Sequence, residues 1–463
     1  MQRLFAIAKL TLRAAFRYRL VQILVLLLLG AVIGLPLVIK HDGTAQGFTQ
    51  IVLTYTLGAI TTLLGFATLW MACGTLARDV EECQMQMVAV KPIARWEIWV
   101  GKWAGIMLLN VLLLGISGAA VYFLMQWRAG QLPPEAQEKL RNEVLVARGS
   151  IKQTVDNAAI EAVVEQRLQE RLKDSKVAAM DRDFVRRQIR EQVKAGAQVV
   201  PPNANGGRRW VLSTGLLKDA LRDKPLELRI KFVVAQPNAS GTYYGAWYIG
   251  PPNGRRYQVE QPSLAADTFH EIPLPPGLLD ENGNLVVDFV NFNDTALLFS
   301  LEDGIEVLYP DSGFGLNFIR GLGIISCWLA LLAAIGLCAA SFLSFPVAAF
   351  VSLGVLVVGL SSGTVKQVVE EGGIAAVNHE TGHVDAPTLL DMIALPVFKG
   401  LLQVINLVHG FSPIDSLSSG RSVSWGELAR AVAQIVLLMG GFFAAVGVIS
   451  FTRRELATAQ GTQ

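Results

Sequence analysis

Residues 321–362 read GLGIISCWLALLAAIGLCAASFLSFPVAAFVSLGVLVVGLSS, and none of these side chains carries a charge. A helix needs about 20 apolar residues to cross the hydrocarbon core of a bilayer. This stretch is roughly twice that length, and Ser344-Phe345-Pro346 interrupts it near its middle. It therefore predicts two consecutive membrane spans joined by a tight turn.

Similar apolar blocks occur on both sides of this stretch, and each is long enough for one span. They cover residues 20–39, 51–75, 103–127 and 431–451. Six spans are therefore expected. Residues 388–409 are also apolar, but Asp391, Pro396 and Lys399 interrupt them, so short helices at the outer interface are expected there. If that segment crossed the membrane instead, the C-terminus would lie outside.

The N-terminal residues 1–19 predict a helix that lies on the membrane surface. At 100° per residue, Lys9, Arg13 and Arg17 share one arc with Arg3, and apolar residues occupy much of the rest. The alternative is a plain positive flank of the first span. Both readings place this end in the cytoplasm, and residues 452–456 (TRREL) favour the same side for the C-terminus.

The composition changes at residue 128, and span parity puts the region 128–316 outside. Residues 134–197 are rich in Glu, Arg, Lys, Gln and Ala with apolar residues at helical spacing, which predicts two or three helices. Residues 209–310 contain alternating β-branched and aromatic residues between turn sequences, which predicts a small antiparallel β-sandwich. The aromatic residues of 243–257 fit its core and rim better than a ligand platform.

The expected fold is thus an α-helical polytopic membrane protein of six spans, with an inserted α+β extracytoplasmic domain made of a helical arm and a β-sandwich. Residues 1–127 hold the interfacial helix and spans one to three. Residues 128–316 form the insert, and 317–463 hold spans four to six with an external loop at 363–430.

The link between the second and third spans, residues 76–102, carries more polar groups than any other short link between spans. It begins with an acidic cluster and ends in a basic-aromatic run. Such an element can bind a partner protein by charge complementarity. We therefore interpret it as a cytoplasmic docking element. Its polar residues include Asp79, Glu81, Glu82, Lys91, Arg95 and Lys102, and its aromatic residues are Trp96 and Trp99.

Several functions are disfavoured by the sequence. No G-x-x-x-x-G-K-[ST] motif occurs, since Gly101-Lys102 is followed by Trp103, so ATP-driven work would need a partner chain. The net charge of +2 gives no general attraction to nucleic acid. Charged residues are nearly absent from the expected spans, which argues against an ion-coupled transporter. The 4 cysteines lie in or beside apolar segments, outside the polar insert.

One short motif formally matches that of zinc proteases. His379-Glu380-Thr381-Gly382-His383 fits H-E-x-x-H, in which two histidines one helical turn apart bind zinc and the glutamate activates water. Gly372-Gly373, Gly382 and Pro387 oppose a regular helix here. A solvated loop is therefore the preferred reading of His379, Glu380 and His383. Zinc binding, and with it a membrane metalloprotease, remains an alternative.

The stretch 76–102 resembles the ABC transporter permeases of the type-2 exporter class. That family shows a Glu near the end of the second span and a Pro-x-x-Arg-x-x-(aliphatic)-x-x-Gly-Lys run before the third. Glu81 matches the first feature, and the run is matched by Pro92, Arg95, Ile98, Gly101 and Lys102. The resemblance covers 1–127 and 317–456 but not 128–316.

The resemblance implies a non-enzymatic permease of the bacterial cytoplasmic (inner) membrane that dimerises with itself or a second permease. It would bind cytoplasmic ABC ATPase subunits, need no cofactor, and leave the insert to contact substrate or an envelope protein. The alternative is an envelope sensor or scaffold that works without an ATPase. The residues that the resemblance implies for ATPase coupling are Asp79, Glu81, Glu82, Pro92, Arg95, Gly101 and Lys102.

Overall fold

The computed structural model describes residues 2–17, 19–38, 45–82, 93–153, 157–173, 182–204, 206–252, 254, 256–301, 303–360, 369, 396–400, 402–403, 405 and 410–454. The chain divides into two compact units. Residues 1–147 and 313–463 form one, here called the helical unit, and residues 148–312 form the other, here called the sheet unit.

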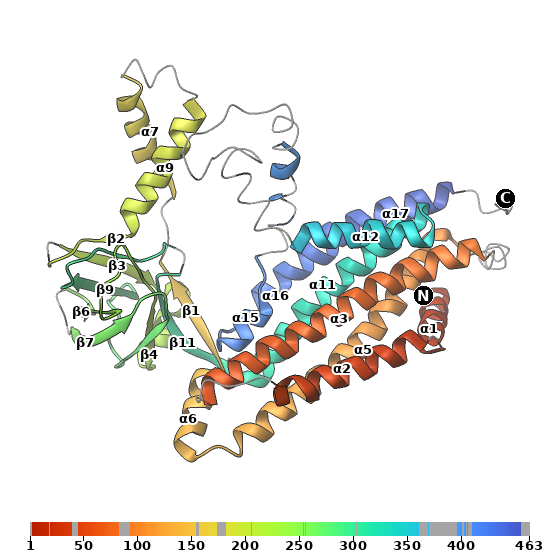
Figure 1. Cartoon of the computed structure of the whole chain (residues 1–463), viewed down its shortest axis with the longest axis horizontal. Helices are drawn as coiled ribbons and strands as arrows, with labels where there is room; N and C mark the ends of the chain where they lie inside the picture. Colours follow the sequence, from red (N-terminus) through yellow and green to blue (C-terminus); the bar gives the residue numbers. More distant parts are fainter. Residues whose placement is uncertain are drawn as a thin grey trace. The chain divides into compact units, whose positions relative to one another are not determined.

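The helical unit is built from long apolar helices and a few short ones (Figure 1). Its elements are α1 (Gln2–Arg17), α2 (Arg19–Val38), α3 (Ala45–Glu81), α5 (Arg95–Ala129), α6 (Pro134–Glu143), α11 (Phe314–Phe342), α12 (Phe345–Leu360), α15 (Pro413–Ser418), α16 (Trp425–Ala431), the π-helix η2 (Val432–Gly440) and α17 (Gly441–Arg453).

Helix α11 forms the centre of this unit and packs against α3, α5, α12 and α17. Small residues make this possible, because they let helix backbones approach closely. A Cβ atom at Gly336 would lie only 2.7 Å from the Cβ of Ala72 on α3. Within the same bundle, the Thr68 hydroxyl of α3 donates to the Asn110 side chain of α5 over 3.0 Å.

Four helical segments in the described residues are long and apolar enough to cross a membrane: Thr49–Glu81, Arg95–Ala129, Phe314–Phe342 and Trp425–Arg453. Helix α1 and residues 21–36 of α2 meet at an angle of 72°. If this bent pair counts as one span, the number of candidate spans is five. The expected six spans are therefore not confirmed. The described part of α12 has 16 residues, about 24 Å, compared with a hydrocarbon core of ~30 Å.

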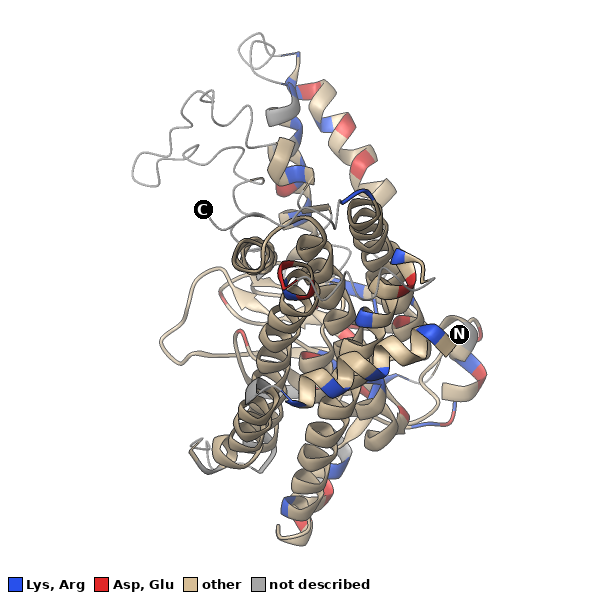
Figure 2. Cartoon of the chain, turned by 90° about the vertical axis from the view of Figure 1, so that its right-hand side faces the viewer, with Lys and Arg blue, Asp and Glu red and all other residues tan. Residues whose placement is uncertain are grey.

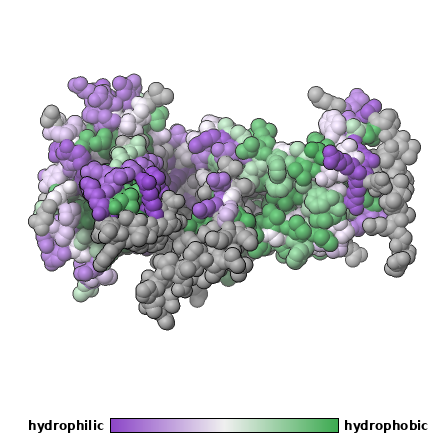
Figure 3. Space-filling view, turned by 90° about the horizontal axis from the view of Figure 1, so that it is seen from above, coloured by the Kyte–Doolittle hydropathy of each residue, from purple (hydrophilic) through white to green (hydrophobic). Residues whose placement is uncertain are grey.

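The face of the helical unit seen in Figure 3 is largely apolar over its middle. Large side chains such as Leu26, Phe123, Phe350 and Leu437 are each at least two-thirds exposed, and they lie on four different elements. Exposed apolar patches of this extent mark an interaction surface.

The sequence predicts an external loop at 363–430, which follows α12. Within the predicted interfacial stretch 388–409, the described residues 396–400, 402–403 and 405 are helical. Further on, α15 packs against α3 and α11. Asn317 at the start of α11 fixes this region, because its amide donates to the Arg421 carbonyl over 2.7 Å and accepts from the Val423 N–H over 2.7 Å.

The sheet unit contains two four-stranded sheets and one three-stranded sheet, in the orders β1-β11-β4-β8, β3-β9-β6-β7 and β2-β10-β5. Its strands are β1 (Val146–Lys152, which starts just inside the helical unit), β2 (Val199–Val200), β3 (Gly207–Ser213), β4 (Leu226–Ile230), β5 (Val233–Val234), β6 (Thr242–Ile249), β7 (Tyr257–Ala265), β8 (His270–Leu274), β9 (Asn284–Asn291), β10 (Leu297–Leu298) and β11 (Ile305–Gly313). The short helices η1 (Gly215–Leu217) and α10 (Lys218–Leu221) follow β3.

The region predicted as a β-sandwich is rich in sheet, and its two four-stranded sheets share one hydrophobic core. Aromatic rings fill the centre: Trp247 lies 4.3 Å from Phe289 and 5.9 Å from Phe299, measured between ring centroids. Tyr243 and Trp247 are buried in this core, whereas Tyr244 on the other face of β6 is half exposed. Successive side chains of a strand point to opposite faces of the sheet, which explains this difference in burial.

Two helices of the sheet unit, α7 (Asn157–Arg171) and α9 (Arg182–Gln198), form an antiparallel pair within the predicted helical region 134–197. Their contact is a small apolar cluster that includes Val164, Leu168 and Ile189. Glu161 pairs with two arginines of α9, Arg186 and Arg190, along its edge. The predicted helical region also contains β1, which no helical pattern anticipated.

A ladder of charged residues crosses the face of the β1-β11-β4-β8 sheet that points away from the core. Glu306 lies opposite Arg229 in the register, and Arg229 lies opposite Glu271. Arg148 on β1 completes it, with Nη1 2.8 Å from Oε2 of Glu271 and 2.5 Å from Oε2 of Glu227. The Arg148, Arg229 and Glu306 side chains are at most 8% exposed, so these charges depend on one another.

A second ion-pair group lies on the other four-stranded sheet. Arg209 and Asp288 face each other across β3 and β9, with Nε 2.7 Å from Oδ1, and Arg256 reaches Oδ2 over 3.0 Å. The hydrogen bond from Arg209, together with both positive charges, holds the pKa of Asp288 below its usual value, although partial burial opposes this. The charged form of Asp288 therefore stabilises the fold.

This pairing predicts a loss of stability in acid. A carboxyl with a lowered folded-state pKa contributes fully above the ordinary aspartate value, and its contribution disappears as the pH falls through the lowered one. Below about pH 4, calorimetry of the sheet unit in the intact chain should show a melting temperature that falls as the pH falls. Asp288→Asn should flatten that dependence, and Asp219→Asn in α10 serves as the control. An unchanged slope in Asp288→Asn would contradict the assignment.

Candidate functional site

The residues predicted for coupling lie at one end of the helical unit, where α3 ends and α5 begins. Figure 2 views the molecule from this side and shows charged residues along the surface helix and the helix ends. Residues 83–92, including Pro92, lie outside the described residues. The described site therefore consists of the two flanks, Asp79–Glu82 and residues 93–102.

Lys102 joins α5 to the end of α3. Its Nζ atom donates to the carboxylate of Asp79 over 2.5 Å and to the carbonyl of Thr75 over 2.7 Å. The Lys102 side chain is 9% exposed, so it cannot exchange these partners for water freely. A cation at a helix C-terminus also interacts favourably with the helix dipole. Lys102 and Asp79 thus form a partly buried connection between α3 and α5.

Glu81 connects α3 to the start of α12. Its Oε1 atom accepts from the backbone N–H of Phe345 over 2.8 Å. A carboxylate at a helix N-terminus satisfies a free N–H and is stabilised by the dipole. The guanidinium carbon of Arg78 lies 4.4 Å from the centre of the Phe345 ring, which adds a cation–π contact. Glu82, the next acidic residue, is exposed.

Arg95, at the start of α5, binds the last turn of α17. Its Nη1 atom lies 2.8 Å from the carbonyl oxygens of Phe451 and Thr452 and 2.7 Å from that of Arg454. Arg454 then reaches the end of α11, with Nη1 3.3 Å from the carbonyl oxygen of Ser341. Carbonyls at the end of a helix lack partners within it. Arg95 therefore caps α17, and Arg454 caps α11.

Gly101 lies where α1 crosses α5. A Cβ atom there would lie 2.8 Å from the Cβ of Ile7, closer than real side chains allow. The start of α5 is itself capped, since the Ala94 N–H donates to the Glu97 carboxylate over 3.0 Å. Glu97 also lies 4.0 Å from Arg3 of α1. The surface helix is therefore seated on α5 by close packing and by charge.

The structure thus brings together most of the predicted coupling residues, but not as one exposed patch. Asp79 and Lys102 pair with each other, while Glu81, Arg95 and Gly101 each contact a different helix: α12, α17 and α1. Among the described candidates, Glu81 and Glu82 are exposed.

Sequence reasoning missed two members of this network. Arg454 was noted only as part of a positive flank, and the backbone amide of Phe345 has no sequence signature. The three residues of the zinc-protease motif, His379, Glu380 and His383, lie outside the described residues. Within the described part of the chain, no group of three or more metal-binding side chains occurs.

Comparison with family models, with curated proteins and with solved structures finds no match for this chain.

Proposed function

We propose that this chain is the membrane-spanning permease subunit of an ATP-binding-cassette transporter. It works as a homo- or heterodimer with a separate cytoplasmic ATPase, and it exports a substrate or acts on it mechanically. Both chain ends are cytoplasmic in this proposal, because their positive flanks are retained on that side. Four helical segments suited to spanning a membrane support it.

The observation that carries the proposal is the bonding at the two flanks of residues 83–92. Glu81 is bonded to the start of α12, and Arg95 is bonded to the end of α17. A displacement of the 83–92 segment by a partner would therefore move α3 and α5 and, through these bonds, α12 and α17. Packed helices that shift together as rigid bodies are a recurrent form of switching.

The sheet unit is the proposed contact for substrate or for an envelope protein. It lies between α6 and α11 in the sequence, and span parity puts it on the outer side. The charged α7–α9 pair and the half-exposed Tyr244 offer surface for such a partner.

The experiment is affinity purification of the chain from its native membrane with identification of the bound proteins. An ATP-binding-cassette ATPase should co-purify with the wild type. Lys91→Glu, within residues 83–92, should weaken that association, whereas Lys218→Glu in the sheet unit should not. Arg95→Gln should retain the ATPase but lower the ATP turnover of the purified complex about tenfold, as expected for losing charge-assisted bonds.

Two results would contradict the proposal. One is full cellular function with no ATPase bound, which would instead support an envelope sensor or scaffold. The other is a Lys91→Glu variant that binds the ATPase as well as the wild type, which would remove the docking role of the 83–92 segment.

A further inference from the structure

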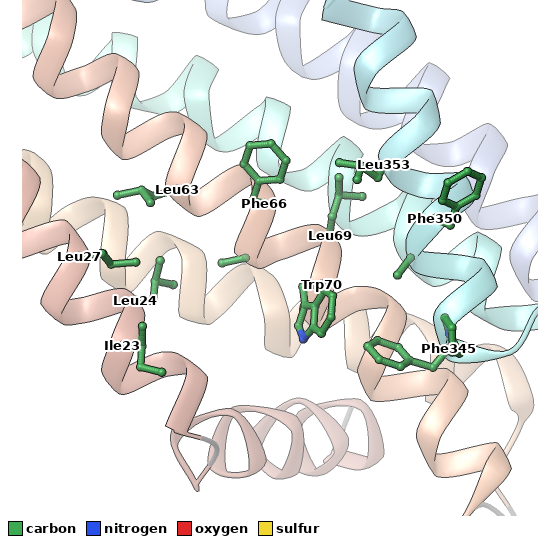
Figure 4. A pocket seen from close by; sticks show the side chains of 13 residues that line it. Ile23, Leu24, Leu27, Leu63, Phe66, Leu69, Trp70, Phe345, Phe350 and Leu353 are labelled. Carbon is green, nitrogen blue, oxygen red and sulfur yellow. The ribbon is translucent and has the colours of Figure 1, made fainter.

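The helical unit has a groove of about 620 Å³ on its side, between α2, α3 and α12. Figure 4 shows the side chains that line it. They are almost all aliphatic or aromatic. They include Ile23 and Leu27 from α2, Phe66 and Trp70 from α3, and Phe345 and Phe350 from α12.

The length of the groove argues against a spanning helix as its occupant. Its lining covers residues 63–70 of α3 and 345–353 of α12, which is about 10–12 Å along each helix axis. A spanning helix would need contacts over the ~30 Å hydrocarbon core, whereas an acyl chain of one leaflet covers about half of that. The dimensions therefore fit one leaflet's lipid chain.

A positive charge lies at one end of the groove. Arg78 stacks on Phe345, with 4.4 Å between its guanidinium carbon and the ring centre. Phe345 itself lines the groove and meets Trp70 edge to face at 5.1 Å. The guanidinium group of Arg78 therefore contacts a ring that is itself part of the apolar lining.

Two acidic residues near Arg78 bind other groups, and a third, Glu82, is exposed one turn further along the chain. Glu81 accepts from the Phe345 N–H, and Asp79 pairs with Lys102. The surface helix α1, which precedes α2, carries the exposed cations Arg13 and Arg17. The groove thus combines an apolar wall with a cationic end, which complements an amphiphile with a negative headgroup.

We propose that this groove binds an anionic phospholipid of the cytoplasmic leaflet, with an acyl chain along α3 and α12 and the phosphate at Arg78. Basic pockets between membrane helices on the cytoplasmic side recognise such headgroups. The inference rests on the membrane location proposed above, but not on coupling to an ATPase. Its test therefore uses the permease chain alone.

The test is native mass spectrometry of the full chain, purified in mild detergent and offered palmitoyl-oleoyl phosphatidylglycerol or the phosphatidylethanolamine with the same chains. The wild type should retain more phosphatidylglycerol. Arg78→Gln should lower that preference about fivefold, the effect of one cation near an anionic headgroup. Leu353→Trp should fill the groove and reduce retention of both lipids.

Matched controls separate the groove from the rest of the surface. Arg430→Gln removes an exposed cation from α16, and Leu112→Trp enlarges an exposed apolar residue of α5, and neither should alter lipid retention. An unchanged lipid preference in Arg78→Gln would overturn the proposal. So would a Leu353→Trp variant that keeps its lipid but loses its dimer, since that result would assign the groove to a second copy of the chain.

Discussion

Asp79→Leu is expected to destabilise the helical unit by about 3 kcal/mol, the lower end of the range for breaking a buried ion pair. The variant would leave the Lys102 ammonium group, whose side chain is 9% exposed, without its carboxylate partner. Among the described residues, the ammonium group would then keep the Thr75 carbonyl as its partner. Thermal unfolding of the detergent-solubilised chain, followed by the accessibility of a buried cysteine, measures the effect.

A double variant makes the interpretation specific. Asp79→Leu combined with Lys102→Met replaces the pair by apolar side chains of similar length, and such replacements are often neutral. It should recover most of the lost stability. Glu135→Leu on the exposed face of α6 controls for the loss of an acidic residue. If the double variant is no more stable than the single one, the ion pair is not the source of the effect.

Glu271→Ala should destabilise the sheet unit by about 3 kcal/mol or more. Both terminal nitrogens of Arg148 bind this carboxylate, at 2.8 and 3.1 Å. Burial lowers the pKa of Arg148, but the hydrogen bonds and charges of Glu271 and Glu227 outweigh it and raise the pKa overall. Arg148 therefore stays charged, and the variant leaves that charge buried with one carboxylate fewer.

Limited proteolysis of the sheet unit in the intact chain provides the measurement. Glu271→Ala should be cleaved within 148–312 at a lower temperature than the wild type, while Glu281→Ala, in an exposed turn, should behave like the wild type. Equal protease resistance in all three proteins would show that the charged ladder contributes nothing to stability.

The long helices were predictable because their cause is local. A charge-free run has one stable form in a bilayer, and the predicted span 103–127 lies within α5. The span count was less predictable, because a run such as 321–362 does not show how much of its second half is helical. Helix α12 is described only from Phe345 to Leu360.

The bonds of the candidate site could not be predicted from the sequence. Arg95 binds backbone carbonyls that follow it by more than 350 positions, and a carbonyl has no residue type. Strand β1 was missed for a different reason. Its sequence VARGSIK stands between charged helical segments, and its hydrogen-bond partner β11 comes much later in the chain. Long-range pairing, not local propensity, makes it a strand.

The order of strands in the sheet unit has an evolutionary consequence. The chain enters this unit through β1 and leaves it through β11, and these two strands are neighbours in one sheet. In the helical unit, the flanking helices α5 and α11 are also neighbours, with Tyr122 stacked 6.0 Å from Phe314. Insertions succeed where entry and exit points are close. The 148–312 unit is therefore an exchangeable module, which a lineage can gain, lose or replace while the helices around it keep their packing.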